Sequence, residues 1–383
     1  PSGSRTPADA DVLARLDALA GRAGPGRIAV ERAQLGVPAA WASPLADEAE
    51  LDTARFDRGL DLRWLRTSYS AITAATHEAW VASEPEEPED DDDPAPPLRA
   101  APSPVAPSAL PSPLAALPGG AEVGTLIHAV LQATDFTVGE LDAELALRLA
   151  QARTWSSVQT GPEGELVAGL RAAIETPLGP LAEGARLRDV ERADRLDELA
   201  FELPLAGGER PRGTVTPARI AALLRERLAA DDPLAGYAER LRDPALERGV
   251  RGYLTGSLDL VVRLRDGGQS RFAVIDYKSN RLAGRDEALT VDHYRPAALR
   301  AEMLDRHYAL QALLYLVALH RFLRWRLAGY DPDRHLAGAI YLFLRGMSGP
   351  GGPVGSGVPY GVFAWQPPDG LVPALSDLLD GGR

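Results

Sequence analysis

Two aspartates and a lysine are the residues whose types and spacing best fit a catalytic site. Asp259 lies in residues 253–265 (YLTGSLDLVVRLR), and Asp276 and Lys278 lie in residues 270–279 (SRFAVIDYKS). Both segments read as β-strands, and an Asp-Gly-Gly turn separates them. Side chains alternate in direction along a strand, so Asp276 and Lys278 share one face. Asp259 is predicted to face away from its apolar neighbours Leu258, Leu260 and Val262. An antiparallel pairing would then bring both carboxylates together beside the ammonium.

Two carboxylates next to one ammonium can form a site for a hard divalent cation. Oxygen ligands select Mg²⁺ or Mn²⁺ over softer metals, and such an ion polarises a phosphodiester and lowers the pKa of a bound water. Lys278 is the only lysine among 41 basic residues, the rest being arginine, and Asn280 is the only asparagine. A compact ammonium can orient water or offset phosphate charge in a geometry that a wide guanidinium does not reproduce. The alternative is an ordinary strand with solvated Asp and Lys on its outer face.

Three further polar residues lie on segments with helical periodicity. His128 is one turn inside a predicted helix, and a neutral imidazole is a competent ligand for a divalent cation. Gln311 and Tyr315 are four residues apart and share one face of a helix predicted for residues 301–326. A packed histidine and an amphipathic core helix are the alternative interpretations. The arginine-rich end of this helix either follows a phosphate backbone or is solvated; its arginines are Arg321, Arg324 and Arg326.

Composition excludes several classes of site. The chain has no cysteine, which rules out disulfides, zinc-thiolate sites and cysteine-ligated iron–sulfur clusters, and a reducing cytoplasm is the natural compartment. The lone lysine lies in a strand rather than a GxxxxGK[ST] loop, so no P-loop ATPase is predicted. No apolar run is long enough for a membrane span. The net charge of −13 argues superficially against a nucleic-acid partner, but without the eight acids between Glu84 and Asp93 it is −5.

A compositionally biased segment, residues 82–122, divides the chain. Its acids, prolines, alanines and serines cannot bury enough apolar area to fold, so we predict an extended, disordered linker; a proline-rich ligand for a partner domain is the alternative. Residues 1–81 hold short helical patterns, too little for an independent domain. Residues 123–383 mix helices with strands and predict a mixed α/β domain. Its further predicted strands are 199–207 and 337–346, and its helical patterns cover 123–181, 216–248 and 301–326.

Five of these segments, in this order and at these intervals, closely resemble the C-terminal nuclease domain of the RecB family. They are GTLIHAVLQATDF, RGYLTGSLDLVVRL, FAVIDYKSN, LQALLYLVALHRFLRWRLAGYD and HLAGAIYLFLRGM. RecB proteins are the beta subunits of the bacterial exonuclease V complex, RecBCD. The resemblance covers about residue 123 to the C-terminus. LRWLRTSYSAIT also resembles the end of the family's helicase region, so residues 1–81 would be a remnant of that region before the linker.

The resemblance implies a restriction-endonuclease-like PD-(D/E)XK core, which is a small mixed sheet flanked by helices, here with a helical insertion. By motif, it makes His128, Asp259 and Asp276 metal ligands, together with the backbone carbonyl of Tyr277. It makes Lys278 the catalytic lysine.

Further site residues follow from the same resemblance. Gln311 and Tyr315 match the family's QxxxY helix, which would position DNA or support the site from behind. Glu198 matches an acidic active-site residue of the family. Gln132 departs from the pattern, because family members often carry glutamate at this position.

The implied function is a DNA nuclease dependent on Mg²⁺, with Mn²⁺ as a substitute, that hydrolyses phosphodiesters with an activated water. It would act on single strands unwound from duplex ends, within an assembly with RecC-like and RecD-like subunits, in degradation of linear DNA and repair of double-strand breaks. ATP would be used only by a helicase motor outside this chain, and neither an iron–sulfur cluster nor a membrane partner is expected. A catalytically inactive nuclease-like scaffold or DNA-binding module is the alternative. A third hypothesis makes residues 1–122 mainly a docking element for partner subunits.

Overall fold

The computed structural model describes residues 8–32, 36, 64–69, 72, 110–208, 215–243, 246, 251–266, 269–284 and 287–381. The chain forms two compact units, Pro1–Leu60 and Asp61–Arg383. In the first unit, helix α1 (Asp9–Ala23) buries none of its side chains. The second unit holds the remaining described elements. Most of the predicted linker, residues 82–109, lies outside the described residues.

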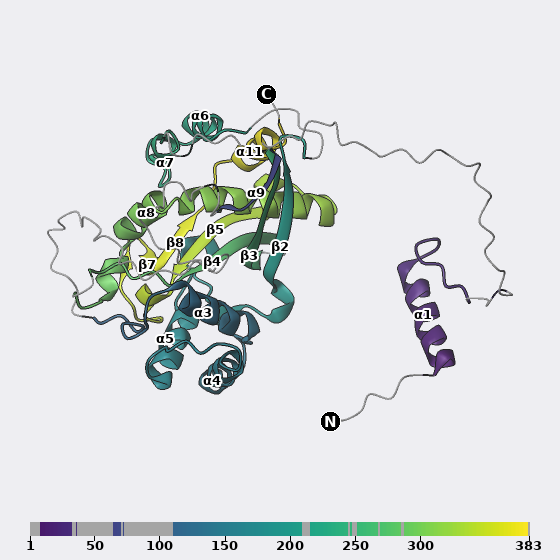
Figure 1. The fold of residues 1–383 in the computed structure, drawn as a ribbon, viewed down its shortest axis with the longest axis horizontal. Helices are drawn as coiled ribbons and strands as arrows, with labels where there is room; N and C mark the ends of the chain where they lie inside the picture. Colours follow the sequence, from purple (N-terminus) through teal and green to yellow (C-terminus); the bar gives the residue numbers. More distant parts are fainter. Residues whose placement is uncertain are drawn as a thin grey trace, which may run out of the picture. The chain divides into compact units, whose positions relative to one another are not determined.

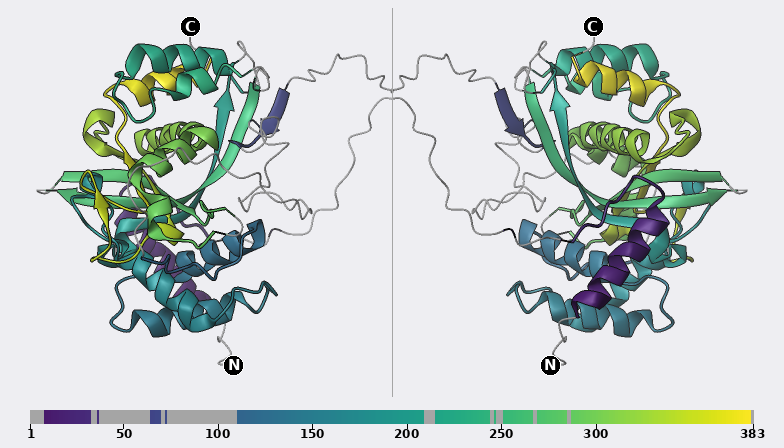
Figure 2. Two further views of the ribbon diagram at one scale, coloured as in Figure 1. Left: turned by 90° about the vertical axis from the view of Figure 1, so that its left-hand side faces the viewer. Right: turned by 90° about the vertical axis from the view of Figure 1, so that its right-hand side faces the viewer.

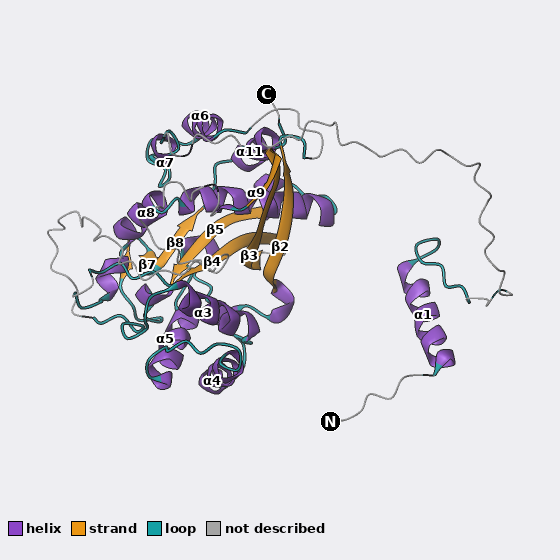
Figure 3. Ribbon diagram, viewed as in Figure 1, coloured by secondary structure: helices purple, strands orange, loops and turns teal. Residues whose placement is uncertain are grey.

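A six-stranded mixed sheet forms the centre of the second unit (Figures 1 and 3). Its strands are β1 (Trp64–Thr67), β2 (Arg195–Leu205), β3 (Arg251–Asp266), β4 (Gln269–Lys278), β5 (Leu336–Phe343) and β8 (Val362–Trp365). Neighbouring strands pair in the order β1-β3-β4-β5-β8. Strands β1 and β4 pair with different parts of one edge of β3, and β2 pairs with its opposite edge. The pairs β1–β3 and β4–β5 are parallel, and the remaining pairs are antiparallel. A separate hairpin joins β6 (Val354–Gly355) to β7 (Val358–Pro359).

Helices cover both faces of this sheet (Figures 1 and 2). On one face lie α6 (Pro217–Arg227), α7 (Tyr237–Arg240), α8 (Pro296–Asp305), α9 (Tyr308–Arg326) and α11 (Leu371–Leu379). On the other face lie α3 (Ala121–Ala133), α4 (Leu141–Ala152) and α5 (Glu163–Glu175). Strand β4 serves both cores, because Val274 packs on the α9 side while Ala273 and Ile275 pack on the α3 side. The predicted mixed α/β architecture is confirmed. Shorter elements are α10 (Pro332–His335) and the 3-10 turns Pro180–Ala182, Leu187–Asp189, Arg192–Asp194, Val291–Tyr294 and Leu344–Gly346.

The helix predicted for residues 301–326 is in fact two helices, α8 and α9, broken at His307. This residue has a left-handed backbone with φ of 58°, and its Nδ1 is 2.9 Å from the hydroxyl of Tyr237. Because of this break, α9 runs in a different direction from α8. Every residue of α9 from Tyr308 to His320 is buried on this face of the sheet. A helix buried on all sides shows little amphipathic periodicity, which is why the sequence did not mark its start.

The end of the predicted linker packs against the second unit. Leu114 and Leu117 are buried, and Ser112 N–H donates to the carbonyl of Leu289. The side chain of Arg345, which is fully buried, donates to the carbonyl oxygens of four residues: Leu114, Leu117, Pro118 and Ser279. The structure therefore groups residues 110–120, like strand β1, with the domain that was predicted to begin at residue 123. Arg345 lies in the 3-10 turn that ends β5, where the sequence predicted strand to residue 346.

Arg345→Met is expected to lower the free energy of unfolding by about 3–5 kcal/mol, because the carbonyl oxygens that Arg345 serves would lose their donor inside the protein. Urea unfolding followed by tryptophan fluorescence measures this change. Arg324→Met, at an exposed arginine, is the matched control and should stay within about 0.5 kcal/mol of the unchanged chain. An unchanged urea midpoint for Arg345→Met would show that this side chain does not anchor the segment.

Candidate active site at the fork of the sheet

Strand β3 has two different neighbours along one edge, and the candidate site lies where they separate. Its last residues pair with β4, while Arg251–Leu254 pair with β1. Among the described residues, the β3–β4 ladder ends at the pair Leu260–Ile275. Beyond that pair, the N–H of Tyr277 donates to the side-chain carboxylate of Asp259 on β3 at 2.9 Å. The carboxylate thus occupies the fork between the strands.

The fork also changes the side-chain alternation of β3. Leu258 packs in the core on the α9 side, whereas Leu260 and Val262 pack on the α3 side. The prediction that Asp259 faces away from all three of these residues is therefore wrong. The regular alternation breaks at Asp259, which lies opposite the left-handed Glu198, and the carboxylate of Asp259 is directed toward Tyr277 and α3. The predicted antiparallel pairing of the two strands is confirmed.

Glu198 lies on β2, on the other side of β3 from β4. Its neighbours pair as Asp197–Leu260 and Leu199–Leu258, which places Glu198 opposite Asp259. Glu198 itself has a left-handed φ of 47°, a conformation that costs a non-glycine residue roughly 1–3 kcal/mol and is often found at functional sites. Its carboxylate accepts a hydrogen bond of 2.8 Å from the hydroxyl of Ser257.

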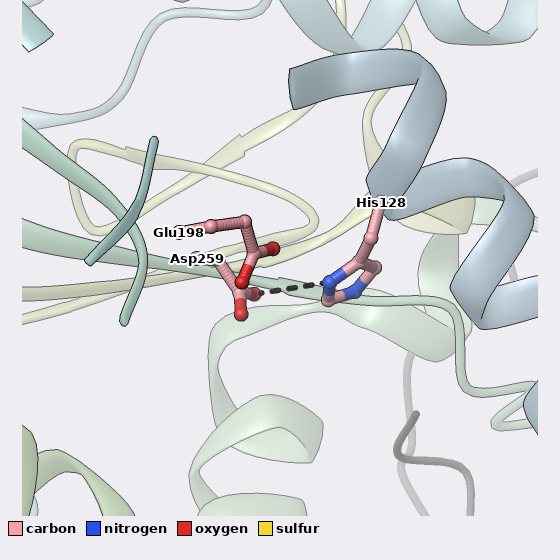
Figure 4. A group of neighbouring side chains, drawn as sticks. All are labelled: His128, Glu198 and Asp259. Carbon is pink, nitrogen blue, oxygen red and sulfur yellow. Dashed lines mark ion pairs between the residues drawn. The ribbon is translucent and has the colours of Figure 1, made fainter. Parts of the chain in front are cut away.

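His128 on α3 completes a cluster of three potential ligands. One ligand atom from each of His128, Glu198 and Asp259 lies within 4.8 Å of the other two, and Figure 4 shows both carboxylates pointing toward the imidazole. His128 Nε2–H donates to the carbonyl of Tyr277 at 3.0 Å, and Nδ1 lies 3.5 Å from Asp259 Oδ2. Burial lowers the pKa of His128 below its usual value, which favours the neutral ring; the nearby charge of Asp276 opposes this shift.

This geometry fits a divalent cation. With its proton on Nε2, the neutral His128 ring turns the lone pair of Nδ1 toward Asp259, so that two acceptors face one another with Glu198 alongside. A cation between them removes that conflict, and the Nε2–H bond to a backbone carbonyl fixes the tautomer as it does in metal sites generally. Two carboxylates with one imidazole suit Mg²⁺ or Mn²⁺.

Asp276 and Lys278 lie next to this cluster, at the C-terminal end of β4. Both are buried, and Lys278 Nζ is 3.1 Å from Asp276 Oδ2. They share one face of β4 as predicted. Asp276 is not one of the three residues whose ligand atoms lie within 4.8 Å of one another, but its charge and that of Lys278 both act on the pKa of His128. The ion pair therefore borders the cluster.

Most of the chain is similar to known proteins. Residues 108–357, which are 250 of the 383, match the PD-(D/E)XK nuclease superfamily. The chain belongs to the PD-(D/E)XK nuclease superfamily. It is 45% identical, over 97% of its length, to the RecBCD enzyme subunit RecB of Mycolicibacterium smegmatis. The corresponding values are 44% over 94% for RecB of Mycobacterium tuberculosis, and 29% over 92% for RecB of Escherichia coli. The chain spans only 34%, 32% and 26% of these three relatives.

In this member of the PD-(D/E)XK superfamily, the QxxxY residues of α9 lie inside the protein. Gln311 and Tyr315 are buried, and Gln311 accepts from the hydroxyl of Tyr341 at 3.0 Å and donates to Tyr315 at 3.2 Å. Tyr341 pairs with Asp276 across β4 and β5, so the network lies directly behind the candidate site. Of the two roles considered for this helix, support of the site from behind fits this burial.

The arginines at the end of α9 do not act alike. Arg321 donates to the hydroxyl and carbonyl of Ser376 and to the carbonyl of Pro204, so it ties α9 to α11 and β2. Arg324 and Arg326 are exposed. Gln132, where family members often have glutamate, is also exposed. None of the described helices is long and apolar enough to cross a membrane.

Sequence reasoning missed a group of arginines that holds α3, the helix that carries His128. Arg195, three residues before Glu198, donates to the carbonyls of Thr134 at 2.7 Å and Gln132 at 3.2 Å. Arg192 donates to the carbonyl of Ala133 at 2.9 Å. Positive charge at the C-terminal end of a helix is favourable. The only signal in the sequence is the arginine-rich stretch ARLRDVERADR, which does not reveal which helix end it meets.

Proposed function

We propose that this chain is a Mg²⁺-dependent DNA nuclease domain. The observation that carries the proposal is the approach of His128, Glu198 and Asp259 to within 4.8 Å, with the Asp276–Lys278 ion pair beside them. These residues come from α3, β2, β3 and β4, so the cluster depends on the whole fold rather than on one segment.

The residues have separate roles in the proposed reaction. His128, through Nδ1, and Asp259 hold the cation, with Glu198 at its edge and the carboxylate of Asp276 beside them. The carbonyl of Tyr277, also expected as a ligand, instead accepts from His128 Nε2–H and orients the ring. When bound, the cation supplies Lewis acidity, which activates a water and polarises the phosphodiester.

Lys278 contributes a fixed positive charge. Its ammonium, buried against Asp276, offsets negative charge that grows on the phosphate oxygens and orients the attacking water. Burial strengthens this electrostatic effect, because few water molecules screen the ammonium.

The names of the relatives support a place for this nuclease within a larger assembly. They are called RecB subunits of RecBCD enzymes, and the chain spans about a third of the first two. We therefore propose RecC-like and RecD-like partners, single strands of DNA as substrate, a cytoplasmic location and a role in processing double-strand breaks. ATP hydrolysis would belong to parts of the longer protein outside this chain.

Metal removal tests the proposal. The chain should cleave a labelled single-stranded oligonucleotide with Mg²⁺ alone, without ATP; EDTA should reduce cleavage to background and added Mg²⁺ should restore it. Asp276→Ala should stay at background, whereas Asp142→Ala, at an exposed aspartate on α4, should match the unchanged chain. DNA binding without cleavage at any Mg²⁺ concentration would instead support the inactive scaffold.

A further inference from the structure

The only lysine and the only asparagine of the chain are joined by one tyrosine. Lys278 is the last residue of β4, and Asn280 follows two positions later. Tyr308, the first residue of α9, places its ring under the ammonium, with Lys278 Nζ 4.1 Å from the ring centroid. The hydroxyl of the same tyrosine lies 3.0 Å from Asn280 Nδ2, which donates to it.

A second tyrosine extends the aromatic surface around the ammonium. The ring centroid of Tyr341 on β5 is 5.7 Å from Lys278 Nζ, and the rings of Tyr308 and Tyr341 stack at 6.1 Å with 25° between their planes. Each hydroxyl is held by a side-chain amide, that of Tyr308 by Asn280 and that of Tyr341 by Gln311. All of these side chains are buried, so the rings have fixed positions behind the ammonium.

Asn280 is suited to hold Tyr308. Its amide can donate to the tyrosine hydroxyl through Nδ2, and its Oδ1 lies 3.3 Å from the same hydroxyl. Its own position is fixed by Tyr294, whose hydroxyl donates to the backbone carbonyl of Asn280 at 2.7 Å. An aspartate would lack the donor and would place a charge in a buried site.

The ammonium of Lys278 thus has attractive partners on two sides. The carboxylate of Asp276 draws it toward the proposed cation site, and the aromatic faces attract it from behind. A cation over an aromatic ring gains most when both are removed from water, as they are here. An unbranched lysine with a single partner would keep several rotamers, whereas two partners on different elements select one.

We propose that Tyr308 is a positioning residue for the catalytic ammonium of Lys278, and that Asn280 holds Tyr308 in place. The proposal rests on the nuclease function proposed above. It explains why α9 starts with a left-handed break at His307, since the break brings the first residue of the helix under the end of β4. It also gives the single asparagine a role that the metal ligands do not supply.

Because the chain has one lysine, NMR can observe Lys278 without any requirement for activity. In protein labelled with ¹³C at lysine Cε, one signal is expected, with its Hε protons shifted upfield by the ring beneath them. Tyr308→Leu should remove the upfield shift, and Tyr308→Phe should keep most of it. A signal at the position of a solvent-exposed lysine, or one that Tyr308→Leu leaves unchanged, would overturn the proposal.

Steady-state cleavage of a single-stranded oligonucleotide supplies the functional readout. Tyr308→Leu should lower kcat by about 10- to 100-fold with unchanged KM, since the reacting groups are bound but misplaced. Tyr308→Phe and Asn280→Ala should each lower kcat by a similar factor, which is smaller than that of Tyr308→Leu. The double variant Tyr308→Phe/Asn280→Ala should lower kcat no further than either single change. Tyr330→Leu, at a tyrosine beyond the far end of α9 whose hydroxyl contacts His320, is the matched control and should keep the full rate.

The two readouts separate the possible failures. If the unchanged chain does not cleave DNA with Mg²⁺ while the Lys278 signal is shifted by Tyr308, the nuclease proposal fails and the contact stands. If the chain cleaves but Tyr308→Leu keeps the full kcat, or Tyr308→Phe falls as far as Tyr308→Leu, the positioning role of the ring is refuted.

Discussion

Lys278→Arg should lower the rate of Mg²⁺-dependent DNA cleavage by about 100- to 1,000-fold, although the positive charge is conserved. Lys278 is 5% exposed, and its ammonium fits between Asp276 Oδ2 at 3.1 Å and the ring of Tyr308 at 4.1 Å. A planar guanidinium is wider, donates in a fixed fork and cannot occupy the same position against both partners. Single-turnover cleavage at saturating Mg²⁺ measures the effect on chemistry separately from binding.

Arg271→Lys provides the matched control for this exchange. Arg271 lies on the same strand, seven residues before Lys278 and outside the site. The control should cleave at the rate of the unchanged chain, and both variants should unfold at similar urea concentrations. A Lys278→Arg enzyme with full activity would show that any positive charge suffices, and the explanation for the single lysine would fail.

Asp259→Asn is expected to reduce cleavage by at least about 100-fold while leaving the fold intact. The asparagine carbonyl can still accept the hydrogen bond that Tyr277 N–H donates to Asp259, so the fork between β3 and β4 should persist. What disappears is one negative charge beside His128 and Glu198, and with it much of the attraction for a divalent cation. Cleavage measured over a range of Mg²⁺ concentrations should show a large increase in the concentration needed for half-maximal rate.

The control for this change is Asp194→Asn. Asp194 forms ion pairs with Arg263 and Arg265, near the end of β3 that is distant from the site. The variant therefore also removes one carboxylate charge that contacts β3. Its Mg²⁺ dependence should be that of the unchanged chain. If Asp259→Asn has the same Mg²⁺ dependence as Asp194→Asn, Asp259 does not hold the cation.

Local patterns were sufficient to predict the strands that carry Asp259, Asp276 and Lys278. Alternation and an Asp-Gly-Gly turn define a hairpin by contacts close in sequence, and β3 and β4 end within two residues of the predicted bounds. The sharing of one face by Asp276 and Lys278 follows from that alternation alone. Helices covering both faces of a mixed sheet were predicted by the same reasoning together with the resemblance to the RecB family.

The features that were missed depend on contacts distant in sequence. Asp259 faces the fork because β3 leaves β4 and pairs with β1, which lies nearly two hundred residues earlier. The left-handed Glu198 has no local sequence signal, since glutamate rarely adopts that conformation. Leu114 sits in a Pro-, Ala- and Ser-rich stretch typical of a linker, but the buried guanidinium of Arg345, more than two hundred residues away, supplies hydrogen bonds that composition cannot reveal.

The most direct test of a cation site built from α3, β2, β3 and β4 is a calorimetric titration of Mn²⁺ into the unchanged chain and into Asp259→Asn. A cation site at this position predicts saturable binding to the unchanged chain, with affinity at least about tenfold weaker in the variant. Absence of Mn²⁺ binding to the unchanged chain, or equal affinity in both proteins, would contradict it.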